Sequence, residues 1–223
     1  MSVVSTVRRI GLLGGTFDPI HSGHLDVARA AQRELDLTYV DFLTAQVPPH
    51  RPQPAASSFH RYAMTALAVN GVKGWRASDL ELRMPAPSYT SQTLERFRER
   101  GYRPSELFFL VGADAFKDLH LWRDYPDILG AATFVVVSRP GFPVSVAERR
   151  VSERVILIDA ITADVSSTAI RERRALGQPI AGMVPDSVRQ HIEQHGLYSP
   201  MPPDRRSAGI SPSATASRVH GEN

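Results

Sequence analysis

Cysteine is absent from the 223-residue sequence. Its absence excludes a disulfide framework, a thiolate zinc site and a cysteine nucleophile. Long apolar runs are also absent: the run that follows Arg8 and Arg9 is too short for the core of a signal peptide and far too short to cross a bilayer. With 42% hydrophobic and 22% charged residues, the composition is typical of a globular protein. We therefore expect a cytoplasmic protein without a membrane segment.

Two common phosphate-binding motifs are missing as well. No G-x-G-x-x-G follows the first apolar run, which argues against a dehydrogenase, and no G-x-x-x-x-G-K-S/T occurs, which excludes a P-loop kinase. The formal net charge is +3, and the basic residues are scattered among acidic ones rather than gathered in a run. We expect no nucleic-acid partner, and a surface that tolerates anionic small molecules.

Apolar runs of strand length alternate with helical patterns along most of the chain. The expected strands cover residues 7–13, 39–43, 75–82, 106–112, 132–138 and 155–158. The first expected helix begins near residue 22, and the later ones cover about residues 59–67, 90–100, 167–176 and 185–196. This alternation, without an internal repeat, predicts the α/β class: a Rossmann-like doubly wound parallel sheet in a single domain.

Local signals place several helix ends. Ser22 can cap the first helix, and Pro185 and Gly196 suit the first turn and the end of the last one. The second helix is expected to be amphipathic because it carries an apolar stripe at helical spacing, formed by Phe59, Tyr62, Ala63, Ala66 and Leu67.

Two segments lack any periodicity. Residues 47–57 are rich in proline and are expected to form a loop. From Ser199 onward the composition changes to proline, serine, alanine and arginine. The sequence therefore predicts one domain over residues 1–198 and a disordered tail over residues 199–223.

The turn after the first expected strand has the sequence GGTFDPIHSGHL, residues 14–25. Gly14 and Gly15 allow the backbone to come close to a ligand. The helix that follows directs its free N–H groups and the positive end of its dipole back toward the turn. His21 and His24 stand at the start of that helix, where both imidazoles can reach one bound phosphate. The turn is thus a candidate anion site.

Each of these features has a simpler explanation when it is taken alone. The paired glycines could form an ordinary tight turn. His21 and His24 could bind a metal, although no third ligand stands at a recognisable spacing and the H-E-x-x-H pattern is absent. Either histidine could also cap the helix or sit in the core. The combination of glycines and histidines, with a strand before and a helix after, favours the anion site and predicts no metal centre in the protein itself.

The turn resembles the first signature of the HxGH nucleotidylyltransferase superfamily, in the form used by bacterial nicotinate-nucleotide adenylyltransferases. Residues 165–171, VSSTAIR, resemble its second signature, ISSTxIR, with valine in place of isoleucine. Ser166 or Ser167 can cap the helix that follows, and Arg171 can offer a fork of donors to phosphate oxygens. Further landmarks follow in the expected order, so that the resemblance covers nearly all of the chain except the tail: VPPHR at 47–51, APSYT at 86–90, GAD at 112–114, Trp122, and RPG at 139–141.

The resemblance implies an adenylyltransferase that joins ATP and nicotinate mononucleotide to give nicotinate adenine dinucleotide and pyrophosphate, a step of NAD biosynthesis. In the family reaction, a phosphate oxygen of the mononucleotide attacks the α-phosphorus of ATP directly, so no enzyme nucleophile is needed. Mg²⁺ is expected to arrive with ATP and to neutralise the leaving pyrophosphate.

The resemblance also implies roles for individual residues on the ATP side. His24 would contact the α-phosphate and His21 would help to bind the triphosphate. Arg171 and the amides near Ser167 and Thr168 would hold the β- and γ-phosphates. The remainder of the ATP site would be formed by the turn itself, at Gly14, Gly15, Thr16 and Phe17.

Four places are candidates for binding the acceptor. Trp122 would either stack on the pyridine ring or pack in the core. Tyr89 and Thr90 would present backbone N–H groups to the nicotinate carboxylate at a helix start. Asp114 follows the carboxyl end of an expected strand and would hold a ribose hydroxyl. His50, with its neighbour Arg51, would approach the acceptor phosphate, unless this proline-rich loop is simply solvated.

Three other interpretations compete with this one. A phosphopantetheine adenylyltransferase shares the fold and an HxGH-type turn but lacks the APSYT segment and Trp122. A nicotinamide-mononucleotide adenylyltransferase differs in one acceptor group, a carboxamide in place of a carboxylate. A regulatory module would bind the nucleotide without turnover, but it would have no need of intact His21, His24 and Arg171. The sequence carries no sign of an oligomeric state.

Overall fold

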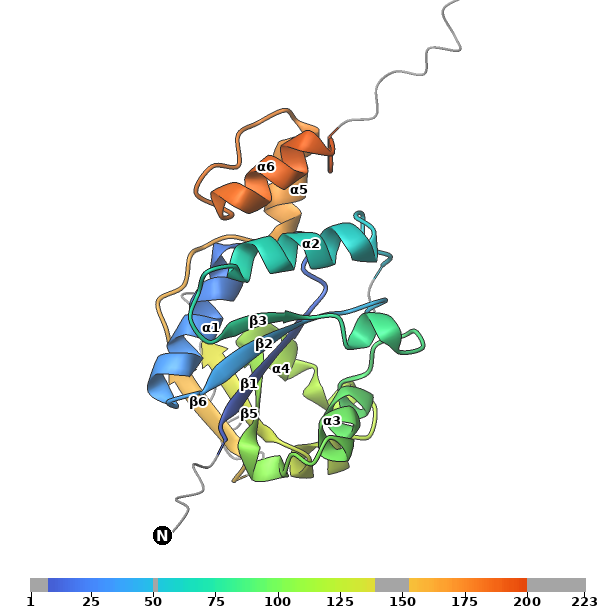
Figure 1. Cartoon of the computed structure of the whole chain (residues 1–223), viewed down its shortest axis with the longest axis vertical. Helices are drawn as coiled ribbons and strands as arrows, with labels where there is room; N and C mark the ends of the chain where they lie inside the picture. Colours follow the sequence, from blue (N-terminus) through green and yellow to red (C-terminus); the bar gives the residue numbers. More distant parts are fainter. Residues whose placement is uncertain (1–7, 50–51, 139–152, 200–223) are drawn as a thin grey trace, which may run out of the picture.

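Six parallel strands form the centre of the molecule. The computed structural model describes residues 8–49, 52–138 and 153–199. The strands, in chain order, are β1 (Ile10–Gly15), β2 (Tyr39–Thr44), β3 (Trp75–Ser78), β4 (Leu107–Gly112), β5 (Thr133–Ser138) and β6 (Val155–Asp159). They lie in the order β3-β2-β1-β4-β5-β6, and each neighbouring pair is parallel (Figure 1). The structure thus confirms the predicted Rossmann-like α/β domain.

Helices connect these strands and cover both faces of the sheet (Figure 1). The α-helices are α1 (Ser22–Glu34), α2 (Ser58–Val69), α3 (Thr90–Glu99), α4 (Ala113–Lys117), α5 (Ser167–Ala175) and α6 (Asp186–Gln194). Short 3₁₀ helices occupy η1 (Glu81–Arg83), η2 (Pro104–Glu106), η3 (Leu119–Leu121) and η4 (Asp127–Gly130). In the part of the chain that the structure describes, no helix is both long and apolar enough to span a bilayer.

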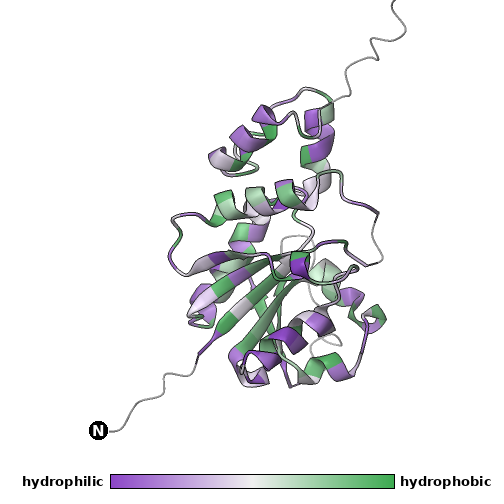
Figure 2. Ribbon diagram, turned by 45° about the vertical axis from the view of Figure 1, so that its right-hand side comes forward, coloured by the Kyte–Doolittle hydropathy of each residue, from purple (hydrophilic) through white to green (hydrophobic). Residues whose placement is uncertain are grey.

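The core consists of two layers, one on each face of the sheet. Successive residues of a strand point to opposite faces, so Leu13 packs in the layer of α1 and α2 whereas Leu12 packs in the other layer. A parallel sheet that is covered on both sides needs apolar residues at every strand position, which explains the unbroken runs LFFLVG and TFVVVS. Figure 2 shows hydrophobic colour concentrated in the strands, whereas the helices carry both kinds of residue.

The strand order reverses between β1 and β4. From β1 the chain proceeds outward through β2 to β3, then crosses to the other side of β1 and continues through β4 to β6. In open sheets of this kind, ligands bind beyond the carboxyl ends of the strands at such a reversal. The segment after Gly15 starts at this place.

Most of the expected elements are present, but three local expectations differ from the structure. The third strand ends at Ser78, because the chain turns there into η1 and buries Glu81. His21, not Ser22, occupies the cap position of α1. Ser22 is the first helical residue, and its hydroxyl donates to the carbonyl of Met183 instead of capping the helix. The last helix starts one residue later than expected, with Pro185 in the cap position.

The apolar stripe expected to make α2 amphipathic does not mark its buried face. Phe59 is 83% exposed and Leu67 is 37% exposed, whereas the buried side of α2 carries Arg61, Met64 and Thr65. The reason is that the guanidinium of Arg61 finds its hydrogen-bond acceptors inside the protein. A pattern based on hydrophobicity alone would place an arginine such as Arg61 on the exposed side of the helix.

Candidate active site

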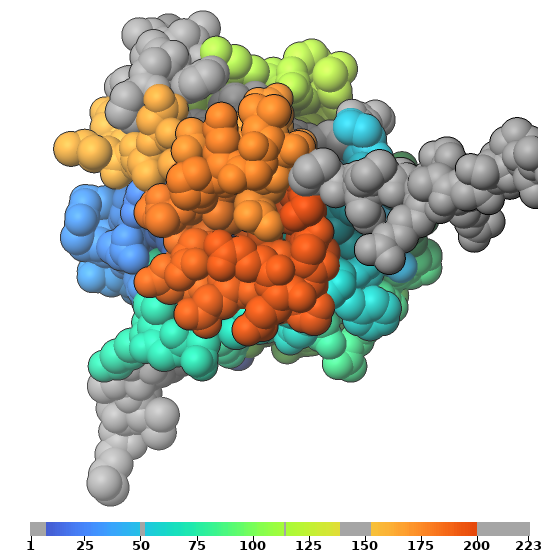
Figure 3. Space-filling model, turned by 90° about the horizontal axis from the view of Figure 1, so that it is seen from above, coloured from blue at the N-terminus to red at the C-terminus, as the bar shows by residue number. Residues whose placement is uncertain are grey.

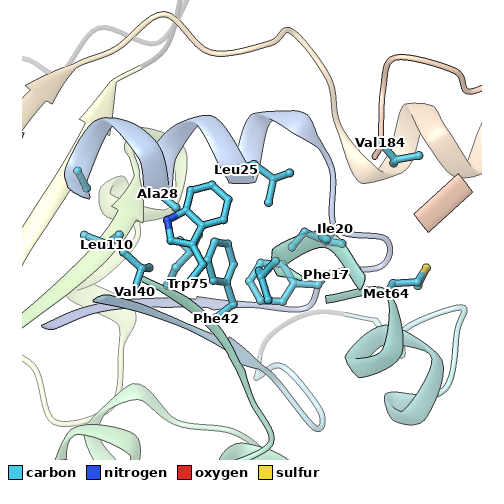
Figure 4. Packing of buried hydrophobic residues seen from close by; sticks show 14 of the residues in the cluster. Phe17, Ile20, Leu25, Ala28, Val40, Phe42, Met64, Trp75, Leu110 and Val184 are labelled. Atoms are coloured by element: carbon cyan, nitrogen blue, oxygen red, sulfur yellow. The ribbon is translucent and has the colours of Figure 1, made fainter. Parts of the chain in front are cut away.

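The turn between β1 and α1 is shaped by a buried aromatic ring. Phe17 is 1% exposed and has a φ of 49°, in the left-handed region. A Cβ on Gly15 would lie 2.6 Å from the Phe17 ring, so only glycine fits there. Figure 4 shows Phe17 in the apolar cluster with Phe42 and Ile20. The core on this side of the sheet therefore fixes the path of the turn.

His21 and His24 lie one above the other at the start of α1. Their ring centroids are 3.7 Å apart with an interplanar angle of 29°. The rings of Phe17 and His24 meet edge-to-face, with their centroids 5.1 Å apart. The backbone N–H of His21 donates to Nδ1 of His24 over 3.3 Å. Since Nδ1 is the acceptor, the neutral ring of His24 carries its proton on Nε2. The expected pairing of the two imidazoles at the helix start is therefore present.

Gly23, between the two histidines, allows a second loop to approach. A Cβ at Gly23 would lie 3.2 Å from the His21 ring and 3.3 Å from the carbonyl oxygen of Ala163. The backbone N–H of Ala163 in turn donates to Asp26 over 2.9 Å. The loop that leads to the second signature is thus held against the start of α1.

The second signature contacts the same turn. Ser166 caps α5 by accepting from the backbone N–H of Ala169 over 3.1 Å, which decides between the two candidate caps. The Ser167 hydroxyl donates to the carbonyl of Pro19 over 2.9 Å, and Nη1 of Arg171 donates to the carbonyl of Asp18 over 2.8 Å. Nη2 of Arg171 donates to the Thr168 hydroxyl over 3.3 Å. Two motifs far apart in the sequence therefore meet at one place.

The carboxylate of Asp18 is buried and binds to groups from two other segments of the chain. It accepts hydrogen bonds from the backbone N–H groups of Ala55, at 2.7 Å, and Ala56, at 3.0 Å, and from the Tyr198 hydroxyl, at 2.7 Å. Burial and the Asp18 charge raise the pKa of Tyr198 far above its ordinary value, so this hydroxyl keeps its proton. Asp18 thus joins the turn to the loop before α2 and to the segment after α6.

Arg61 of α2 links the turn after β1 to the connection between β2 and α2 through backbone carbonyl groups. It is 1% exposed, and Nη1 donates to Thr16 over 2.7 Å and to Ala45 over 2.6 Å. Nη2 donates to Gln46 over 2.8 Å and Nε donates to Ala56 over 3.2 Å. Burial lowers the pKa of Arg61 and Asp18 opposes that effect; the guanidinium stays charged. This residue holds the turn after β1 and the segment after β2 in fixed relation.

The segment before α3 is attached to the same loop. Ser88 accepts from the backbone N–H of Gln46 over 2.9 Å, and its own N–H donates to Val47 over 2.9 Å. Tyr89 then caps α3 and Thr90 is its first residue, so both lie at a helix N-terminus as expected.

Two further side chains support this segment. The guanidinium of Arg123 lies 4.8 Å above the Tyr89 ring. Beneath α3, the hydroxyl of Thr93 donates to the carboxyl of Glu81 over 2.7 Å. Burial raises the pKa of Glu81, while hydrogen bonds from Thr93 and Ser88 work in the opposite direction.

Trp122 packs against the apolar core. It meets Phe109 edge-on at 6.0 Å and Phe134 at 6.5 Å, and its residue is only partly buried. The core-packing role is therefore present. Phe109 also faces Gly14, whose missing Cβ would lie 3.4 Å from that ring. Trp122 and Gly14 thus flank the same phenylalanine.

Two of the four candidate places for the acceptor fall partly or wholly outside the described structure. His50 and Arg51 lie outside the described residues, as does the RPG segment. Asp114 belongs to the first turn of α4, directly after β4, but its side chain also falls outside the description.

Sequence reasoning did not single out Arg61, the carboxylate of Asp18 or Tyr198. The signal for Asp18 was its place before a proline in the turn. The signal for Arg61 was an arginine between apolar positions of a helix. Neither signal names a partner, because the partners are backbone atoms of distant loops.

Comparison with known proteins places these observations in a family. Residues 12–173 match the model of the family described as Cytidylyltransferase-like. A protein of Thermus thermophilus named "Probable nicotinate-nucleotide adenylyltransferase" is 44% identical over 190 residues, which are 85% of this chain and 99% of that protein. One of the same name from Roseiflexus sp. is 43% identical over 195 residues, 85% and 97% of the two chains. This chain belongs to the nicotinate-nucleotide adenylyltransferase family.

The fold of this family member also matches a solved structure. Plasmodium falciparum nicotinic acid mononucleotide adenylyltransferase, complexed with APC, aligns with a TM-score of 0.73 over 86% of this chain and 97% of that one. The identity is 18%, so the match concerns the fold alone. Both signatures described above fall within the part that the family model covers.

Proposed function

We propose that this chain is a nicotinate-nucleotide adenylyltransferase, which joins ATP and nicotinate mononucleotide to give nicotinate adenine dinucleotide and pyrophosphate in NAD biosynthesis. The observation that carries the proposal is the meeting of His21, His24 and Arg171 at one turn, beyond the carboxyl ends of β1 and β4. Cationic and neutral donors from two distant signatures converge where an open parallel sheet binds its ligand.

The turn itself would receive the triphosphate of ATP. The backbone from Gly14 to Phe17 and the N-terminus of α1 supply N–H groups and a favourable dipole. Nε2 of His24 carries the proton that would be donated to an oxygen of the α-phosphate, because Nδ1 is already an acceptor. His21, stacked against it, would bind a neighbouring phosphate oxygen.

The start of α5 would hold the distal phosphates. The fork of Arg171 reaches over the turn to the Asp18 carbonyl and to the Thr168 hydroxyl, and its remaining N–H groups would bind β- and γ-phosphate oxygens. The backbone amides at Ser167 and Thr168 lie in the first turn of the helix, where amides lack intrahelical partners.

The chemistry requires no covalent enzyme intermediate. An oxygen of the nicotinate mononucleotide phosphate forms a bond to the α-phosphorus, and the bond from that phosphorus to the pyrophosphate oxygen breaks. Catalysis then consists of positioning the two phosphates and stabilising the negative charge on the equatorial oxygens.

Magnesium would enter as part of Mg·ATP. The oxygens of the Asp18 carboxylate in the turn already accept three hydrogen bonds, so that carboxylate is not placed to act as a metal ligand. Mg²⁺ is commonly held by substrate phosphates and water, which fits this arrangement. The chemistry that it would supply is neutralisation of charge on the leaving pyrophosphate.

The acceptor would bind between α3 and the segment after β4. Trp122 would stack on the pyridine ring with the face that the core leaves accessible, and the N–H groups near Tyr89 and Thr90 would bind the nicotinate carboxylate. Asp114 would accept from a ribose hydroxyl, and His50 would approach the acceptor phosphate. The cytoplasm, where ATP is supplied, is the proposed compartment.

The experiment that tests the function is pyrophosphate release by purified protein with Mg·ATP. Nicotinate mononucleotide, nicotinamide mononucleotide and phosphopantetheine are compared as acceptors in parallel. We expect kcat/KM to be at least roughly tenfold higher for nicotinate mononucleotide, because a site built for its carboxylate leaves donors unpaired with the amide. Preference for another acceptor would overturn the specificity and keep adenylyl transfer. ATP binding without release for any acceptor would favour a regulatory module.

A further inference from the structure

Three histidines outside the active site gather between the two helices α2 and α6. His60 lies in the first turn of α2, whereas His191 and His195 lie at the end of α6. α6 packs against α2 and lies next to it in Figure 1, and Figure 3 shows α6, in red-orange, on the face seen from above. Nδ1 of His60 and Nε2 of His191 are 3.1 Å apart, and one ring nitrogen from each of the three histidines lies within 4.8 Å of the others.

The sequence and the packing both favour this convergence. The pattern H-I-E-Q-H spaces His191 and His195 four residues apart, which places them on one face of a helix. His60 is brought opposite them because Val188 and Ile192 of α6 are buried and the Ser187 hydroxyl donates to the Leu67 carbonyl of α2 over 3.2 Å. The cluster is thus built on two packed helices, not on a loop.

We propose that His60, His191 and His195 form a binding site for a divalent transition metal of the zinc type. Imidazole nitrogen is a preferred ligand of such ions, and three histidines with water in the fourth position make a complete tetrahedral set. Zn–N bonds of about 2.0–2.1 Å at tetrahedral angles separate ligand nitrogens by about 3.3 Å. The separations here, 3.1 Å for one pair and within 4.8 Å for all, need only small side-chain rotations.

The cluster is partly shielded from solvent, because His60 and His191 are half-buried between the two helices. His195 is exposed, which gives a metal ion and its water ligand access from solvent.

The site serves stability rather than the transfer reaction. It clamps α6 onto α2, next to Arg61, which holds the turn and the loops around it. None of the three histidines is among the residues proposed to bind ATP or the acceptor. Zinc binding and adenylyl transfer can therefore be tested separately, and failure of one leaves the other unaffected.

The test is calorimetric titration of Zn²⁺ into protein that has no affinity tag and has been freed of metal with a chelator. We expect about one Zn²⁺ per chain, and a weakening of at least roughly tenfold in the His195→Ala and His60→Ala variants, since two imidazoles hold zinc poorly. His120→Ala is the matched control: it removes an exposed histidine elsewhere and should bind zinc as the parent protein does. Equal affinity in all four proteins, or no binding in any, overturns the proposal.

Thermal unfolding gives a second readout that does not depend on activity. At a Zn²⁺ concentration about 100 times Kd, we expect the Tm of the parent protein and of His120→Ala to rise by about 5–10 °C. In His195→Ala, the same zinc concentration should change the Tm by less than about 2 °C. Because His195 is exposed, its replacement should not disturb folding. A rise of equal size in His195→Ala contradicts the clamp.

Discussion

His24 shows how a single backbone contact can set the chemistry of a side chain. Because its Nδ1 accepts from the backbone N–H of His21, its other nitrogen is the proton donor. His24→Ala removes that donor from the transition state, and we expect kcat to fall roughly 10²–10³-fold. Steady-state pyrophosphate release measures the loss. A folded variant with near-normal turnover would rule out this role, and His120→Ala should keep the kcat of the parent protein.

Trp122 combines a packing role with a proposed stacking role, and kinetics can separate the two. Trp122→Phe keeps an aromatic ring against Phe109 and Phe134 but offers less area to the pyridine ring. We expect KM for nicotinate mononucleotide to rise about fivefold, a loss of roughly 1 kcal/mol, with KM for ATP unchanged. Equal changes in both KM values would indicate a purely structural residue.

At the scale of elements, α2 is the support of the site. Arg61 donates to the carbonyls of Thr16, Ala45, Gln46 and Ala56, and a lysine ammonium cannot reproduce that planar fork. Arg61→Lys should leave buried carbonyls unpaired and lower the free energy of unfolding by roughly 2–5 kcal/mol. Urea denaturation measures it. The exposed Arg33→Lys in α1 is the control, with a change below about 0.5 kcal/mol; a similarly small change in Arg61→Lys would contradict the prediction.

The contact between α2 and α6 should make stability depend on pH. Burial, with a contribution from His195 and His60, lowers the pKa of His191 below 6.5, so the unfolded chain binds this proton more readily than the folded protein. The contribution of neutral His191 to the free energy of unfolding is fully present above about pH 6.5, and it is lost as the pH falls through the pKa of His191 in the folded protein. Urea midpoints with a chelator at several pH values from neutral down to mildly acidic should fall less steeply in His191→Gln than in the parent protein. Parallel curves for the two proteins would show that His191 does not carry the effect.

At the scale of the whole molecule, the last described residues close the structure around the turn. Tyr198 donates to Asp18 over 2.7 Å and the Ser199 hydroxyl accepts from Arg174 over 3.1 Å. A variant that ends at Ser199 should keep kcat/KM within about twofold of the full chain. One that ends at Leu197 should lose about 1.5–3 kcal/mol of stability, the worth of a hydrogen bond to a charged group. Equal stability of the two truncated proteins would contradict the role given to Tyr198.

Much of the site could be predicted from the sequence because its chemistry is local. The turn from Gly14 to Leu25 places its residues through the covalent chain, so the position of His21 and His24 at one helix start follows from spacing. The segment VSSTAIR likewise predicts a capped helix start, although only the structure shows that Ser166 is the cap. Similarly, the strands of residues 107–112 and 133–138 are continuous apolar runs, as the strands of a sheet covered on both faces require.

The alternation of strands and helices, the Rossmann-like class and the two signatures can therefore be recognised in the amino-acid sequence alone. In contrast, the inward position of Arg61, the bond between Asp18 and Tyr198 and the contact of His60 with His191 became visible only once the chain was folded. Each of these contacts joins side chains or carbonyls from distant segments, and no periodicity encodes such a partner. The physical reason is that propensity and spacing act along the chain, whereas burial and hydrogen-bond satisfaction act across it.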